Sequence, residues 1–259
     1  MVKGLDVFRE YFKDYSDRYI IIGGTACDIV ISAAGLTPRA TKDIDVVLVV
    51  ESLDPGFVRQ FWKFIKDGKY GEQQKSASDM TYYRFMNPSI GGFPQQVELF
   101  SRRPDAIDGD ASARFTAIPV DDDLSSLSAI LMDDRYYMFT LEHSIAEAGL
   151  TRAQTPALIC LKAKAFLDLR SRRDAGERVD EKSIRKHTLD VFRLAVLLPA
   201  RTIVDLPEPL KEDMQKFVVV VGTDLPDQAI FKEMGAVGID VDKLFQQLLS
   251  VFALVRQSG

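Results

Sequence analysis

The sequence predicts an α+β protein, with an α/β first half over residues 1–150 followed by an α-helical second half over residues 151–259. Two observations predict this division. Before Gly149, short apolar runs bounded by turn residues alternate with helical patterns, and after Gln154 the patterns are helical throughout. A chain of 259 residues that is 46% hydrophobic is long enough for one large domain or two ordinary ones.

Each element of the first half is predicted from its own apolar pattern. Apolar residues spaced by three and four predict helices, and short apolar runs between turn residues predict strands. Thr25, with Asp28 three residues later, matches the T-x-x-D capping box that opens a helix. The expected elements are helix 5–14, strand 18–22, helix 25–35, strand 43–50, helix 55–66, and strands at 81–86, 96–100, 116–120, 126–131 and 136–141.

The second half is predicted to consist of helices. Residues 156–172 and 183–198 form two of them, separated by a charged loop over 173–181. Two or three more helices are expected after Pro209, the last over 241–255. No internal repeat or low-complexity tract interrupts the pattern.

The composition excludes several classes of protein. A net charge of -5 excludes an indiscriminate polyanion binder, although residues 155–201 carry 11 Lys and Arg against 6 Asp and Glu. This basic segment suits either a localised nucleotide or RNA site or a solvated helical surface. Cys27 and Cys160 lack the spacing of a zinc site or a disulfide framework.

The sequence predicts no interaction with a membrane. The first residues, Met1 to Asp6, lack the apolar stretch of a signal peptide. No uncharged run approaches the ~18 residues that a spanning helix requires. We therefore expect a cytoplasmic protein.

Asp43 and Asp45 are the strongest candidates for chemistry. Because side chains alternate along a strand, these two carboxylates point to the same face. The run Val46 to Val50 beyond them is nearly all apolar, as expected of a central strand, and aspartate is disfavoured in strands. The pair is therefore either a chance feature of a half-buried strand or a site for a hard divalent cation such as Mg²⁺.

Two further features strengthen the second interpretation. Glu98 is a single acid in the apolar strand 96–100, so it is either an exposed edge residue or a third carboxylate of a two-metal site. Gly23 and Gly24 lie between a strand and a predicted helix, where backbone amides and the helix dipole can hold phosphate. Together these features indicate metal-assisted phosphoryl or nucleotidyl chemistry.

These residues resemble the polymerase-beta-type nucleotidyltransferase superfamily. Its signature is an apolar strand, a Gly-Gly or Gly-Ser turn, a helix, then D-x-D and a later acid on a neighbouring strand. Three segments narrow the resemblance to the AbiEii-type branch, which comprises toxin components of abortive-infection and toxin-antitoxin systems. They are Arg39 to Asp45 (RATKDID), Leu158 to Lys164 (LICLKAK) and Lys186 to Arg193 (KHTLDVFR), within a similarity that covers residues 15–200.

The chain departs from this family at two places. The gap from Gly24 to Asp43 is longer than in the compact members of the superfamily. His187 stands where relatives with a K-D-x-x-D motif carry an acid. The transferred group and the acceptor therefore stay open.

The resemblance implies a fold, a reaction and a set of roles. The fold would be a mixed β-sheet of the nucleotidyltransferase type with flanking helices, and the helical half would complete an active-site cleft. The reaction would move a nucleoside monophosphate from an NTP to a hydroxyl of an RNA or protein, with an antitoxin protein as a candidate partner. The implied metal ligands for Mg²⁺ or Mn²⁺ are Asp43, Asp45 and Glu98, and the implied nucleotide-binding residues are Gly23, Gly24, Thr25, Arg39, Lys162, Lys186 and Asp190.

The helical half leaves alternatives open at its charged residues. Lys162 shares a helix face with apolar residues, so it either reaches out to water or projects to meet phosphate. Lys186 and Asp190 form either a surface ion pair four residues apart or part of an active site. For the whole protein, the alternative function is a catalytically inactive nucleotide-binding or protein-interaction module.

Overall fold

A computed structural model describes residues 2–75, 81–102, 107, 116–117, 130–131 and 133–256, with the backbone alone at 72–75, 81 and 116–117. The chain divides into two compact units. Unit 1 comprises Met1–Ile29, Ala40–Asp121 and Ser144–Ala153, and unit 2 comprises Val30–Arg39, Asp122–His143 and Gln154–Gly259. The predicted boundary between domains at residue 150 stays a prediction.

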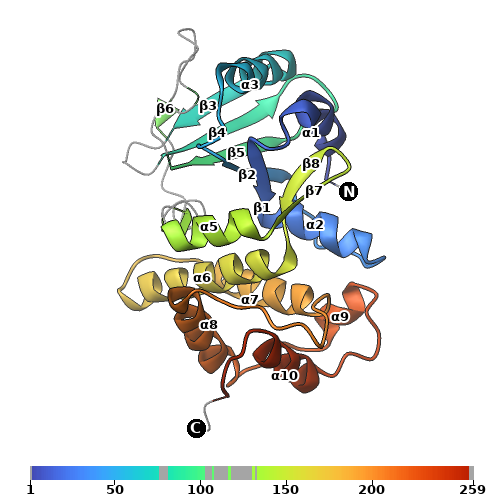
Figure 1. Ribbon diagram of the computed structural model, residues 1–259, viewed down its shortest axis with the longest axis vertical. Helices are drawn as coiled ribbons and strands as arrows, with labels where there is room; N and C mark the ends of the chain where they lie inside the picture. The colour runs from blue at the N-terminus through green and yellow to red at the C-terminus, as the bar shows by residue number, and fades with distance from the viewer. Residues whose placement is uncertain are drawn as a thin grey trace. The chain divides into compact units, whose positions relative to one another are not determined.

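Unit 1 is built on a mixed β-sheet (Figure 1). In the described part of the chain this sheet has eight strands in the order β6-β3-β4-β5-β2-β1-β8-β7. Its strands are β1 (Tyr19–Ile22), β2 (Asp43–Leu48), β3 (Tyr70–Lys75), β4 (Thr81–Pro88), β5 (Gln96–Ser101), β6 (Thr116–Ala117), β7 (Ser144–Glu147) and β8 (Leu150–Ala153). The α+β fold class with flanking helices is therefore confirmed.

The middle of the sheet is buried, as the apolar sequences of its strands require. β2 pairs with β5 in parallel and with β1 in the antiparallel direction. All four residues of β1 are buried, and β5 is buried from Val97 onward. Strands buried on both faces read as continuous apolar runs, which is why this part of the sheet was predictable.

Helices α1 (Leu5–Phe12) and α3 (Pro55–Gly68) pack together over the sheet through aromatic side chains (Figure 1). Asp54 begins α3 by accepting hydrogen bonds from the backbone amides of Gly56 and Phe57. Phe64, which is fully buried, lies at the centre of this packing. Its ring neighbours are Phe8, Tyr11, Phe12, Phe61, Tyr70 and Phe93.

Unit 2 is organised around the long helix α6 (Thr155–Asp174), which contacts α5 (Asp134–Glu142), α7 (Glu181–Ala195) and α8 (Glu208–Val221). The shorter helices α9 (Ala229–Glu233) and α10 (Val241–Val251) pack on α7. None of the helices in the described ranges is both long enough and apolar enough to cross a membrane.

Two local predictions are wrong. The segment 136–141, expected as a strand, belongs to helix α5, whose amino end is capped by the side chain of Asp133. Aromatic residues favour strands, but Tyr136, Tyr137 and Phe139 here bury themselves at helical spacing. The capping box at Thr25 is also wrong, because α2 (Gly23–Ala33) already begins at Gly23.

Other elements differ from the expected set in extent. The strands β3, β7 and β8 were not predicted; β7 and β8 form a hairpin across the two-residue turn Ala148-Gly149. Of the expected strand 116–120 only β6 is described, and 118–120 lie outside the described residues. Ile130 and Leu131 are helical, and the rest of the expected strand 126–131 also lies outside the described residues.

Replacing Phe64 with alanine tests the aromatic packing. The variant should lower the free energy of unfolding by about 3–5 kcal/mol, because it removes a buried ring and leaves a cavity. Chemical denaturation measures this loss. Ile90 provides the control because it is 38% exposed, so Ile90→Ala should change the free energy of unfolding by no more than about 0.5 kcal/mol. A loss in Phe64→Ala no larger than this would contradict the packing.

Candidate functional site

Strand β2 places two carboxylates on one face of the sheet. Asp43 and Asp45 are half-buried, while Ile44 between them points the other way and is fully buried. The alternation of a strand therefore brings the two acids together, as the sequence predicts.

Strand register places a third acid beside this pair. Asp45 lies opposite Ile22 on β1 and opposite Glu98 on β5, and Glu98 lies opposite Arg84 on β4. Residues that are directly paired across strands share a face of the sheet. Asp45, Glu98 and Arg84 therefore form one row, which the sequence could not specify because it depends on register.

Glu98 is a buried acid, and its Oε1 atom is hydrogen-bonded within the protein. Its residue is 7% exposed, and its Oε1 atom accepts hydrogen bonds from Nε of Arg84 at 2.9 Å and from Nε2 of Gln96 at 2.7 Å. Burial, and next the negative charge of Asp45, raise the pKa of Glu98 well above its usual range, while Arg84 opposes the rise. Glu98 is therefore not an exposed edge residue.

The glycine turn lies directly against Asp45. Gly23 has a φ of +62°, and a Cβ atom built on it would lie 1.8 Å from Oδ2 of Asp45. A Cβ atom on Gly24 would lie 2.7 Å from Oγ1 of Thr41. Only glycine at Gly23 allows both this backbone conformation and this approach, so the turn and the carboxylate are built as one feature.

Thr25 contributes to this feature differently from what was predicted. It is fully buried, and its hydroxyl donates to the backbone carbonyl of Asp43 at 2.5 Å. The side chain therefore attaches the first turn of α2 to the beginning of β2. Its predicted contact with nucleotide phosphates stays a prediction, and any such contact would have to use its backbone.

The chemistry of Asp43 and Asp45 fits a divalent cation. Mg²⁺ is bound in nucleotide sites by one or two carboxylates and by substrate phosphate oxygens. Across the residues that the model describes, no group of three or more His, Cys, Asp or Glu side chains is arranged to hold a metal ion. Two carboxylates completed by substrate oxygens therefore match these residues, and Glu98 as a third ligand stays a prediction.

Unit 2 holds a second ionic centre around Asp190. Its carboxylate lies 3.2 Å from Nζ of Lys162, 3.5 Å from Nε of Arg39 and 3.3 Å from Nη1 of Arg193. The side chains of Lys162, Asp190 and Arg193 are at most 10% exposed. Lys162 therefore points inward rather than to water, and Asp190 belongs to a buried cluster rather than to a surface ion pair.

This Asp190 cluster (Arg39, Lys162, Asp190 and Arg193) carries more positive than negative charge. Burial by itself raises the pKa of Asp190, but the charges of Lys162, Arg39 and Arg193 outweigh burial and lower it. Three cations surround the ionised carboxylate of Asp190, although Nη2 of Arg193 also lies 3.9 Å from the carboxylate of Glu233, and the Arg39 side chain is 36% exposed. Such a cluster can accept an anion such as phosphate.

Two charged residues of these clusters were not assigned from the sequence. Arg84 is a lone charge within the apolar strand β4, which is the same signal that singled out Glu98 on β5. Arg193 shares a helix face with Asp190 three residues before it. Lys186, which was assigned, is half-buried and lies four residues before Asp190 on α7.

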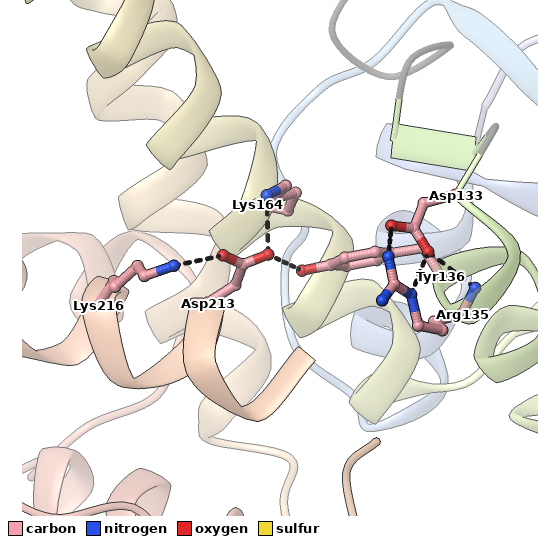
Figure 2. Close-up of polar contacts among 6 residues, drawn as sticks. All are labelled: Asp133, Arg135, Tyr136, Lys164, Asp213 and Lys216. Atoms are coloured by element: carbon pink, nitrogen blue, oxygen red, sulfur yellow. Dashed lines mark hydrogen bonds and ion pairs between the residues drawn. The ribbon is translucent and has the colours of Figure 1, made fainter. Parts of the chain in front are cut away.

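Unit 2 also holds a polar cluster around Asp213, and this cluster is structural. Asp213 on α8 accepts hydrogen bonds from Nζ of Lys164 at 2.7 Å and from the hydroxyl of Tyr136 at 3.1 Å, and Lys216 lies 3.5 Å from its other oxygen (Figure 2). Burial, and next the charge of Asp213, raise the pKa of Tyr136, so its hydroxyl stays a donor. These contacts tie α5 and α6 to α8.

Comparisons with known proteins give a likeness to solved structures. No protein-family model and no curated protein matches the chain significantly. A solved structure, an antigenic nucleotidyltransferase-like protein from Paracoccidioides brasiliensis, is similar at 15% sequence identity with a TM-score of 0.43, covering 95% of this chain and 90% of that one.

Replacing Asp190 with asparagine tests the cluster in unit 2. At pH 7 the variant should lose about 3–5 kcal/mol of unfolding free energy, because Lys162 and Arg193 stay buried without their counter-charge. The folded-state pKa of Asp190 is lowered, so its stabilising effect is complete above the unfolded pKa of about 3.9 and is lost as pH falls through the folded value. The difference from wild type should therefore shrink in acid.

Denaturant unfolding at a series of pH values measures this difference. Asp224, an exposed acid of unit 2, provides the matched control, since Asp224→Asn should change stability by no more than about 0.5 kcal/mol. Equal stability of Asp190→Asn and wild type at pH 7 would contradict an ionised carboxylate at this position.

Proposed function

We propose that the chain is a nucleotidyltransferase, dependent on Mg²⁺ or Mn²⁺, that moves a nucleoside monophosphate from an NTP to a hydroxyl acceptor. The hydroxyl oxygen would attack the α-phosphorus, the bond to the β-phosphate would break, and pyrophosphate would leave. One observation carries the proposal. The glycine turn that opens α2 packs directly on the carboxylate of Asp45, so a helix amino terminus and a pair of acids lie at one place. Phosphate binds favourably at a helix amino terminus, and a cation that bridges phosphate binds favourably to a pair of carboxylates.

Each residue of unit 1 has a defined part in this proposal. Asp43 and Asp45 would hold the cation, and the backbone amides after Gly23 and Gly24 would hold the β- and γ-phosphates. Glu98, which pairs with Asp45 across the sheet, would help to remove the proton of the attacking hydroxyl. A bound cation would supply Lewis-acid neutralisation of the phosphate oxygens.

The Asp190 cluster of unit 2 supports the binding of phosphate. The excess of cations over Asp190 in a largely buried setting is offset when an anion approaches the exposed part of Arg39. We assign Arg39 and Lys162 to phosphate, Asp190 to holding both cations in place, and Lys186 to the flank of the cluster.

The finer assignments rest on the motif resemblance. The segments RATKDID, LICLKAK and KHTLDVFR support an AbiEii-like toxin, and this assignment would make an RNA or a protein hydroxyl the acceptor. A toxin of this type would have an antitoxin protein as its partner and would act in the cytoplasm.

One observation favours a second function. Oε1 of Glu98 accepts both Arg84 and Gln96, so the third acid is occupied within the protein. A catalytically inactive module that binds nucleotide or a partner protein would have this property. The two functions differ in a direct assay, because only the enzyme transfers a labelled nucleotide.

Replacing Asp45 with asparagine tests the proposed function. The variant should abolish transfer and weaken Mg²⁺-dependent NTP binding at least about tenfold, a loss typical of a removed ligand or its support. The fold should persist, because the change removes a like charge beside Glu98. Titration calorimetry with each NTP, and labelled NTPs with a total RNA and protein extract, measure the two effects.

The exposed Asp6 provides the control, since Asp6→Asn should bind NTP as wild type does. Binding of NTP by wild type without any transfer would favour the inactive module. Transfer at the wild-type rate by a folded Asp45→Asn protein would refute the assignment of the acids.

Replacing Gly23 with alanine tests the close approach of the turn. The new Cβ must push Asp45 away, so Mg²⁺-dependent NTP binding should be lost in a protein destabilised by about 1–3 kcal/mol. Gly35 is the matched control, since it has a similar φ of +74° with nothing within 4 Å of its Cβ position. Gly35→Ala should be destabilised yet still bind NTP; equal binding by both variants would remove the role of the turn.

A further inference from the structure

Three consecutive residues attach the start of α2 to one short stretch of chain. Gly23 meets the side chain of Asp45, Gly24 meets the side chain of Thr41, and Thr25 donates to the carbonyl of Asp43. The two glycines make close approaches, but Thr25 alone of the three contributes a side-chain hydrogen bond. Its contact therefore has a direction and a specific acceptor.

The hydrogen bond of Thr25 lies just beyond the end of the ladder between β1 and β2. The ladder between β1 and β2 ends where Ile22 pairs with Asp45. Two residues further toward the start of β2, the hydroxyl of Thr25 reaches the carbonyl of Asp43 at 2.5 Å. A side chain thus continues the attachment of β2 on the β1 side beyond the last pair with β1, at the residue that carries the first acid and that pairs with Gln96 of β5 on the other side.

The burial of Thr25 separates this role from ligand binding. The residue is fully buried, and its hydroxyl is within hydrogen-bonding distance of a backbone acceptor. A hydroxyl in this position joins the first turn of α2 to the start of β2. The bond fixes the β2 backbone at Asp43, two residues before Asp45, and both carboxylates project from this backbone.

We propose that Thr25 is a positioning residue, whose hydroxyl fixes the beginning of β2 so that the carboxylates of Asp43 and Asp45 are spaced to share one divalent cation. This inference rests on the proposed function, since it assumes that the two acids bind metal. Without the bond, Asp43 would keep its pairing with Gln96 on β5 but lose its attachment to the first turn of α2, and the spacing of the carboxylates would vary. Cation affinity would then fall although every carboxylate is present.

Mn²⁺ alone is the probe, and the EPR signal of the free ion measures its binding. Thr25→Val keeps the shape of the side chain and removes the hydroxyl, so Mn²⁺ affinity should fall about tenfold, as for loss of a group that orients a ligand. Thr25→Ser keeps the hydroxyl and should restore affinity close to that of wild type. Melting curves are recorded for each protein.

Thr151 provides the matched control within unit 1. It is also buried, and its hydroxyl also donates to a backbone carbonyl, that of Ser16. Thr151→Val should lower the melting temperature as Thr25→Val does, yet bind Mn²⁺ as wild type does. A purely structural role for Thr25 predicts that the two valine variants behave alike.

The outcomes separate the inference from the proposed function. If wild type binds no Mn²⁺, the metal-dependent function fails and the inference fails with it. If wild type binds and Thr25→Val binds equally well, only the inference is overturned. If Thr25→Val does not fold, the pair Thr25→Ser and Thr25→Ala decides, because these differ only in the hydroxyl; equal affinity in that pair overturns the inference, and a loss confined to alanine supports it.

Discussion

The close approach of the Gly23 backbone to the Asp45 carboxylate is the contact on which the candidate site depends. It requires a residue without a side chain at the end of β1, a left-handed backbone there, and β2 as the next strand of the sheet. These requirements together bring the amino end of α2 to the acids. Any loss of register between β1 and β2 would separate the helix from the carboxylates, since a shift by one residue turns every side chain of a strand to the other face.

Two buried acids, Glu98 and Asp190, have pKa values shifted in opposite directions. Burial, and next the negative charge of Asp45, raise the pKa of Glu98 against the opposing charge of Arg84, so its proton is retained more easily. Asp190 has three cations around it, so its pKa falls and it stays ionised. The two environments thus shift the pKa values of the two acids in opposite directions, because burial and a negative neighbour prevail at Glu98 and cations prevail at Asp190.

Most of the fold was predictable where local pattern and burial agree. β1, β2, β5 and α3 follow from continuous apolar runs or from helical spacing, and each appears near its expected bounds. The prediction failed at α5, where strand-favouring aromatic residues satisfy a helix because neighbouring helices bury them. It also missed the hairpin of β7 and β8, since such short strands become stable only by joining an existing sheet.

The sequence by itself determined the α+β class, the shared face of Asp43 and Asp45, and a glycine turn between a strand and a helix, because these follow from local hydrophobic pattern, the period of a strand and the properties of single residues. Only the tertiary structure decided that Glu98 stands beside Asp45 and is held by Arg84, that Lys162 turns inward to Asp190, and that Thr25 is bonded to β2. The reason is that these contacts depend on strand register and helix packing. They join residues distant in the chain, and their partners cannot be chosen from local pattern.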